Sequence, residues 1–212
     1  MKQVTVKEEI INSITHGLGA VLGVAGTVIA IIWAALYGNA YSVVSASIYG
    51  AMLIILYTMS TLYHAFTNET AKKVFRIFDH CSIFLLIAGT YTPFTLITLN
   101  GPLGWTIFGI IWGLAILGIV LNAVSLEKFK VFSMICYIAM GWLIIIAMKP
   151  VVAALGTKPV LLLLFGGISY TVGAVFYALT RIRYMHGVWH VFVLAGSVLH
   201  YFCILFYVLP VK

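Results

Sequence analysis

The sequence predicts an all-α integral membrane protein, a seven-transmembrane-helix bundle in a single domain. Hydrophobic residues make up 63% of the 212-residue chain and charged residues only 8%. So few charges could not cover the surface of a soluble domain of this size. The apolar residues fall into seven runs, each long enough to cross a hydrocarbon core about 30 Å thick. The start of the chain carries Glu8 and Glu9 and no Ala-x-Ala-like site, so we expect the first run to stay in the mature protein.

Short polar or Gly/Pro-containing breaks separate the predicted spans, such as Gly38-Asn39-Ala40 and Asn100-Gly101-Pro102. A polar segment, residues 1–16, precedes them. Its residues Glu9, Asn12 and His16 share one face of a helix, which is typical of an amphipathic helix lying on the membrane surface. The spans are predicted at about residues 18–37, 41–66, 80–99, 103–124, 131–148, 160–180 and 187–209. We expect no second domain within residues 1–212.

The distribution of Lys and Arg predicts the orientation in the membrane. Nine of these residues fall on the side of the N-terminus: Lys2, Lys7, Lys72, Lys73, Arg76, Lys128, Lys130, Arg181 and Arg183. Three fall on the other side: Lys149, Lys158 and Lys212. The positive-inside rule therefore predicts a cytoplasmic N-terminus and an extracellular C-terminus in a multi-pass protein of the cell membrane. The net charge of +7 is explained by this orientation, and we expect no nucleic-acid partner.

Two histidines four residues apart, His186 and His190, open the last apolar run. Side chains at this spacing lie on one face of a helix and can hold one metal ion. A polar side chain placed where a helix enters lipid costs free energy, so its presence indicates a structural or functional role. If only these two residues are considered, a structural role is more common than metal binding. In that role His186 lies at the membrane interface and His190 hydrogen-bonds a neighbouring helix.

The predicted orientation gathers five of the six histidines near the inner leaflet: His16, His64, His80, His186 and His190. Zinc takes three or four N, O or S ligands, and hydrolytic sites keep one position for water. His64, His186 and His190 can supply three imidazoles. Asp79, the only acidic residue close to a predicted span, could orient the water and accept its proton.

Each of the other polar residues has a structural alternative. Asp79 could instead be the N-cap of the third span or pair with Arg76. Ser60, one turn before His64, could bond the metal-bound water or its own i−4 carbonyl. His80 could face lipid headgroups or protein, and for the mid-span His200 a hydrogen bond to another helix is the more common role. His16 has no assigned role.

Four motifs together resemble the hemolysin III family, the bacterial branch of the progestin and adiponectin receptor (PAQR) family, which is related to alkaline ceramidases. They are Glu9-x-x-Asn12-x-x-Thr15-His16, Ser60-x-x-x-His64, Asp79-His80 followed by the Ile87-to-Pro93 stretch IAGTYTP, and His186-x-x-x-His190. The resemblance spans essentially the whole chain. It implies seven helices, a cytoplasmic N-terminus and an intramembrane zinc.

The resemblance also implies roles for individual residues. Those matching His64, His186 and His190 hold the zinc, Asp79 sits near its water, and Ser60 accompanies the site. The chain lacks the long N-terminal cytoplasmic domain of the eukaryotic receptors, so hormone binding is not carried over to it.

The leading functional hypothesis is a zinc-dependent membrane hydrolase acting on a lipid amide or ester, with membrane lipid as its partner. The alternative is a non-catalytic sensor or regulator of membrane state, in which zinc joins the second and seventh spans. A membrane-lysing hemolysin is the least favoured reading, since the chain has too few charged or amphipathic segments to line an aqueous channel.

Overall fold

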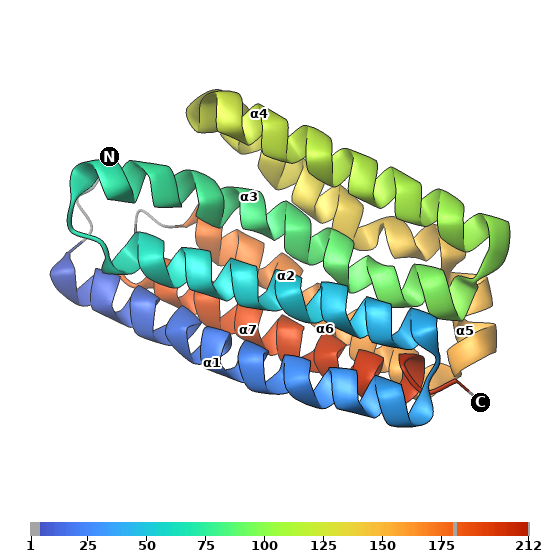
Figure 1. Cartoon of the computed structure of the whole chain (residues 1–212). Coiled ribbons are helices and arrows are strands. Elements are labelled where there is room, and N and C mark those ends of the chain that lie inside the picture. Colours follow the sequence, from blue (N-terminus) through green and yellow to red (C-terminus); the bar gives the residue numbers. More distant parts are fainter. Residues whose placement is uncertain (1–4, 180–181, 212) are drawn as a thin grey trace.

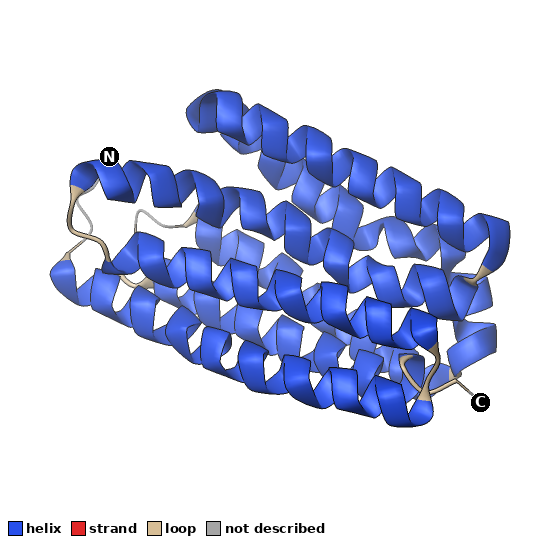
Figure 2. Ribbon diagram, in the orientation of Figure 1, coloured by secondary structure: helices blue, strands red, loops and turns tan. Residues whose placement is uncertain are grey.

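Helices cover nearly all of each predicted span in the structure, a computed structural model that describes residues 5–179 and 182–211. The long helices run side by side along one axis (Figure 1). No strand occurs among the described residues (Figure 2). The helices are α1 (Val6–Tyr37), α2 (Ala40–Ala65), α3 (Glu69–Pro93), α4 (Gly101–Trp142), α5 (Met148–Leu155), α6 (Thr157–Ala178) and α7 (Met185–Cys203). Short π- or 3₁₀-helical turns follow α3, α4 and α7: Phe94–Leu99, Leu143–Ala147 and Ile204–Val208.

Six helical stretches of the described chain are long and apolar enough to cross a membrane: Val6–Tyr37, Ala40–Ala65, Glu69–Leu99, Gly101–Leu155, Thr157–Ala178 and Met185–Val208. The outer face of α1 exposes large apolar side chains such as Val21 and Leu36, each 68% exposed. In lipid such a face is solvated by acyl chains and needs no polar cover. The structure therefore supports an all-helical, multi-pass membrane protein.

The long stretch Gly101–Leu155 reverses direction partway along its length. Its backbone leaves the helical region at Ser125, where φ is −161° and ψ is 95°. The Ser133 hydroxyl donates to Asn122 Oδ1 at 2.6 Å, although eleven residues of straight helix would separate them by about 16 Å. α4 is thus a hairpin of two antiparallel legs (Figure 1). The loop predicted between residues 124 and 131 is reduced to the break at Ser125.

The prediction of a separate amphipathic segment over residues 1–16 is wrong for the described part of that segment. α1 begins at Val6 and continues without a break into the first span. Thr5 caps it, since the Thr5 hydroxyl accepts from the Glu8 backbone N–H and the Glu8 carboxylate accepts from that of Thr5. The polar face with Asn12 and His16 is buried inside the bundle, because its side chains have polar neighbours on other helices.

The breaks predicted at glycine and asparagine residues are confirmed. Asn39 caps α2, its side-chain oxygen accepting from the Ser42 N–H at 3.1 Å. A Cβ on Gly38 would lie 2.5 Å from Ser42 Cβ and 2.7 Å from Leu209 O, so this turn has no room for a side chain. Asn100 caps α4, where Gly101 adopts a positive φ of 64° that glycine tolerates at no steric cost.

α3 lies at the centre of the bundle, and this position sets the depth of the polar residues it carries. From Asp79 to Pro93 all but three residues are buried. Gly118 of α4 packs closely against Phe84 of α3, so that a Cβ on Gly118 would lie 2.2 Å from the Phe84 ring. The start of this buried stretch faces the ends of α1, α2 and α7 that carry the other polar residues.

Candidate metal centre

Three histidines from two helices converge at one end of the bundle. His64 lies in the last turn of α2, and His186 and His190 lie in the first two turns of α7. Each offers one ring nitrogen, and these nitrogens all lie within 4.8 Å of one another. His64 Nε2 and His186 Nε2 are 3.2 Å apart, close to the roughly 3.3–3.4 Å edge of a tetrahedron with bonds of about 2.0–2.1 Å. The three side chains could therefore hold one metal ion.

The remaining nitrogens of two rings are already engaged. His190 Nδ1 lies 3.2 Å from both the backbone oxygen of Asn12 and the Thr15 hydroxyl. The carbonyl can only accept and the Thr15 hydroxyl donates to backbone oxygens of its own helix, so this nitrogen carries the proton. His190 Nε2 is then a lone pair, buried and without a hydrogen-bond partner in the described chain. Buried polar atoms without partners ask for an explanation. A cation between the rings supplies one, and the donor set suits zinc.

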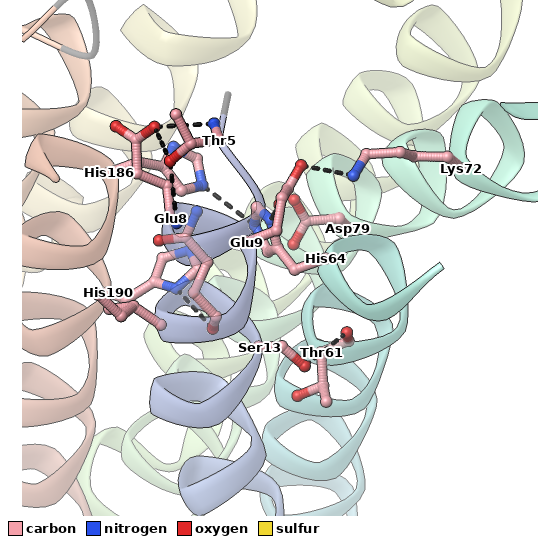
Figure 3. A network of polar contacts seen from close by, with 12 residues as sticks. Thr5, Glu8, Glu9, Ser13, Thr61, His64, Lys72, Asp79, His186 and His190 are labelled. Atoms are coloured by element: carbon pink, nitrogen blue, oxygen red, sulfur yellow. Dashed lines mark hydrogen bonds and ion pairs between the residues drawn. The ribbon is translucent and has the colours of Figure 1, made fainter. Parts of the chain in front are cut away.

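His64 is oriented by a carboxylate. Its Nδ1 lies 2.5 Å from Glu9 Oε2, and the other Glu9 oxygen is 2.5 Å from Lys72 Nζ (Figure 3). Metal-bound histidines commonly donate their second ring N–H to a carboxylate or a carbonyl. His64 makes this contact with the Glu9 carboxylate, and His190 makes it with the Asn12 backbone carbonyl. The three histidines therefore offer candidate ligand atoms, and two of them make the outer hydrogen bonds that are typical of metal-bound histidines.

Asp79 is buried inside α3 and has neither structural role considered from the sequence. α3 begins at Glu69 and is capped by Asn68, so the N-cap interpretation of Asp79 is wrong. Arg76 pairs with Glu127 at 2.5 Å instead. Asp79 is 3% exposed; its Oδ2 makes no hydrogen bond in the described chain and lies 3.6 Å from His80 Nδ1, at ion-pair distance.

Ser60 is fully buried one turn before His64. Its hydroxyl makes no hydrogen bond within the described residues, so the predicted alternative, a bond to its own i−4 carbonyl, is not formed. A buried hydroxyl costs free energy unless it finds a partner. The Ser60 hydroxyl and Asp79 Oδ2 are thus two buried oxygens that make no hydrogen bond among the residues that the structure describes.

The other histidines lie outside the ligand set. His80 faces protein, with ring nitrogens 3.1 Å from Arg76 O and 3.3 Å from the Tyr177 hydroxyl. The hydrogen bond expected for His200 is confirmed, since its Nε2 lies 3.0 Å from Leu163 O on α6. The His16 ring stacks on that of His190, with centroids 3.5 Å apart and an interplanar angle of 14°.

A cavity of about 150 Å³ lies near the three histidines, none of which lines it. It approaches them through His16, whose ring stacks on that of His190. Its polar side chains near the histidines are those of His16, Asp79 and His80. Most of its remaining wall is apolar and comes from α3, the second leg of α4, α6 and α7; it includes Ile83, Ile87, Met134, Ile138, Trp189 and Val193. A cavity with polar side chains near the histidines and otherwise mostly apolar walls suits an amphiphilic molecule.

Sequence reasoning missed the role of Glu9. We placed its helical face on the membrane surface, whereas the structure buries that face and brings Glu9 to His64. A signal was present, because Glu9, Asn12 and His16 recur on one face of a helix that continues directly into an apolar span. The structure shows Asn12 and His16 at His190 and Glu9 at His64.

Known proteins match this chain over nearly its whole length. The family model described as "Haemolysin-III related" matches residues 4–201. "Hemolysin-3" of Bacillus cereus is 51% identical over 205 residues, covering 97% of this chain and 94% of that protein. "Hemolysin-3 homolog" of Bacillus subtilis (strain 168) is 47% identical over 207 residues, covering 98% and 97%. The human "Monocyte to macrophage differentiation factor" is 28% identical over 209 residues, covering 94% and 84%.

Proposed function

Since the chain belongs to the hemolysin III family of membrane proteins, we propose that it is a zinc-dependent hydrolase of a membrane lipid amide or ester. One observation carries this proposal: three imidazole nitrogens that can hold one ion lie near a mostly apolar cavity, which is lined on their side by His16, Asp79 and His80. The proposed ligands are His64, His186 and His190. Asp79 and Ser60 are proposed to act on the reacting groups.

The chemistry of the proposed site divides between the ion and the protein. When bound, zinc supplies Lewis-acid activation of a water molecule and of the scissile carbonyl. Asp79 Oδ2, which makes no hydrogen bond within the described part of the chain, is proposed to take the proton of the attacking water and return it to the leaving group. The Ser60 hydroxyl can donate a hydrogen bond to the water or to the carbonyl oxygen. The apolar walls bind the acyl chain and exclude bulk water.

We further propose seven membrane crossings, with the N-terminus in the cytoplasm. The α4 hairpin supports two crossings within Gly101–Leu155. The Val211 N–H donates to Tyr37 O, so the end of the described chain lies at the end of α1 remote from Val6, about 48 Å along a helix of this length. The nine-to-three distribution of Lys and Arg supports the orientation. Three residues of that count lie outside the described residues: Lys2, Arg181 and Lys212.

This topology predicts that a reporter fused after Lys212 is located on the outer face of the membrane. An enzyme that is active only outside the cytoplasm should be active in this fusion. The same reporter fused before Met1 should be inactive, because nine positive charges hold that side in the cytoplasm. A cytoplasmic C-terminus would contradict the seven-crossing topology.

The proposed activity is tested by removing the metal. We expect the zinc-loaded protein in lipid nanodiscs to release fatty acid from an N-acyl sphingoid lipid or from a glycerol ester. Treatment with a chelator should abolish release, and added zinc should restore it, because water activation is lost with the ion. Zinc-loaded protein that cleaves neither lipid would contradict the hydrolase and favour a regulator in which zinc joins α2 and α7.

Membrane lysis is a second candidate because the Bacillus cereus relative is called "Hemolysin-3". The same nanodisc preparation, reconstituted into dye-loaded vesicles, separates the two activities. A hydrolase should release fatty acid without dye leakage at low protein-to-lipid ratio. Leakage that is insensitive to the chelator would favour lysis.

A further inference from the structure

The first turns of α1 connect the helices that carry the candidate metal ligands. Glu9 reaches α2 through His64 and α3 through Lys72, with both contacts at 2.5 Å (Figure 3). The neighbouring Glu8 accepts from the Tyr184 backbone N–H at 3.2 Å, where α7 begins. The two adjacent carboxylates therefore contact different helices, and that of Glu9 contacts a candidate ligand ring.

We propose that Glu9 is a positioning residue that fixes the tautomer and the orientation of His64, and that Lys72 holds the Glu9 carboxylate in place. The inference rests on the proposed metal site but not on the proposed hydrolysis. It assigns a function to a charged pair that the hydrolytic mechanism does not use.

The tautomer follows from which atoms can donate. An ionised carboxylate only accepts hydrogen bonds, so at 2.5 Å from Glu9 Oε2 the His64 Nδ1 must carry the proton. A neutral imidazole has a single N–H, and Nε2 is then a lone pair. That nitrogen faces His186 Nε2 at 3.2 Å. Glu9 therefore selects the tautomer in which His64 presents its lone pair to the metal position.

Lys72 completes the arrangement by holding the second oxygen of Glu9. Its ammonium group donates only, and it lies 5.4 Å above the centre of the Tyr63 ring. The exposed fraction of the side chain rises through this series of three contacts, from 4% for His64 to 18% for Glu9 and 30% for Lys72. Water can reach the Glu9 carboxylate, and Lys72 therefore limits its movement. Without Lys72, the hydrogen bond between Glu9 and His64 would be formed for a smaller fraction of the time.

The test uses the full-length protein and measures zinc affinity by competition with a chelator. We expect Glu9→Met, which removes the acceptor, to weaken zinc binding by about 10–100-fold, the usual cost of losing such an outer partner. Glu9→Gln keeps an acceptor oxygen but loses the charge, so its loss should be smaller. Lys72→Met should also weaken binding, by less than Glu9→Met. ¹⁵N shifts of His64 should report the Nδ1–H tautomer in the wild type and a mixture in Glu9→Met.

Glu127→Met is the matched control. It removes the carboxylate of a pair with the same 2.5 Å separation, Arg76–Glu127, which touches no ligand ring, so zinc affinity should not change. Wild-type zinc affinity together with an unchanged His64 tautomer in Glu9→Met would overturn the proposal. If Glu9→Met does not fold, Lys72→Met with wild-type affinity would overturn it instead. No substrate is used, so a failure to find lipid hydrolysis leaves this result standing.

Discussion

Replacing Asp79 by Asn is expected to lower the rate of lipid hydrolysis by about 10²–10⁴-fold, the usual contribution of a general base. Asn has nearly the shape of Asp, but it cannot take a proton from water. Asp79 is not among the three nitrogen ligands, so the zinc content and the thermal stability of Asp79→Asn should change little. The measurements are kcat for fatty-acid release and elemental analysis of the same sample.

Glu127→Gln is the control for Asp79→Asn, because it neutralises a carboxylate that is paired with Arg76 away from the histidines. Its activity should match that of the wild type. Full activity in Asp79→Asn would show that Asp79 is structural. Loss of zinc together with activity would indicate instead that Asp79 holds the metal, which favours a closed structural site over a hydrolytic one.

Purified wild-type protein is expected to contain about one zinc per chain, as a site with three protein ligands predicts. His64→Ala, His186→Ala and His190→Ala should each lose it. Removing one of three ligands should weaken binding by far more than the roughly 10–100-fold cost of an outer partner. Elemental analysis after gel filtration measures this directly.

His200→Ala is the matched control for the metal prediction. His200 is also a buried histidine of α7, and it bonds Leu163 O on α6. If the ligand variants lost zinc merely because a buried histidine was truncated, His200→Ala would lose it too. Unchanged zinc in His190→Ala would remove that residue from the ligand set.

Local sequence determined the helices and the pairing of His186 with His190. An apolar run in lipid must satisfy its backbone hydrogen bonds internally, so a run of sufficient length becomes a helix. The second span was predicted at residues 41–66 and is found at Ala40–Ala65. The i, i+4 spacing of the two histidines places them on one face of any helix, whatever surrounds it. Both results follow from periodicity and length alone.

Helix ends outside the apolar runs were decided by capping and packing. The third span was predicted to begin at residue 80, because the preceding stretch is polar. The structure begins α3 at Glu69 behind an Asn68 cap, and this places Asp79 inside the helix. Hydropathy reports where a helix enters lipid, but it does not report where the helix starts in water. The two roles of Asp79 could therefore not be separated from the sequence.

Only the tertiary structure decided which polar side chains meet. Glu9 and His64 are 55 residues apart, and His64 and His186 are 122 apart. The sequence placed the histidines at one end of the spans, but it did not give the rotation of each helix about its axis. That rotation depends on how neighbouring helices pack, at close approaches such as Gly118 against Phe84. Packing turned the polar face of α1 into the bundle, where the Glu9 carboxylate pairs with His64 and Lys72, partners that the apolar phase cannot supply.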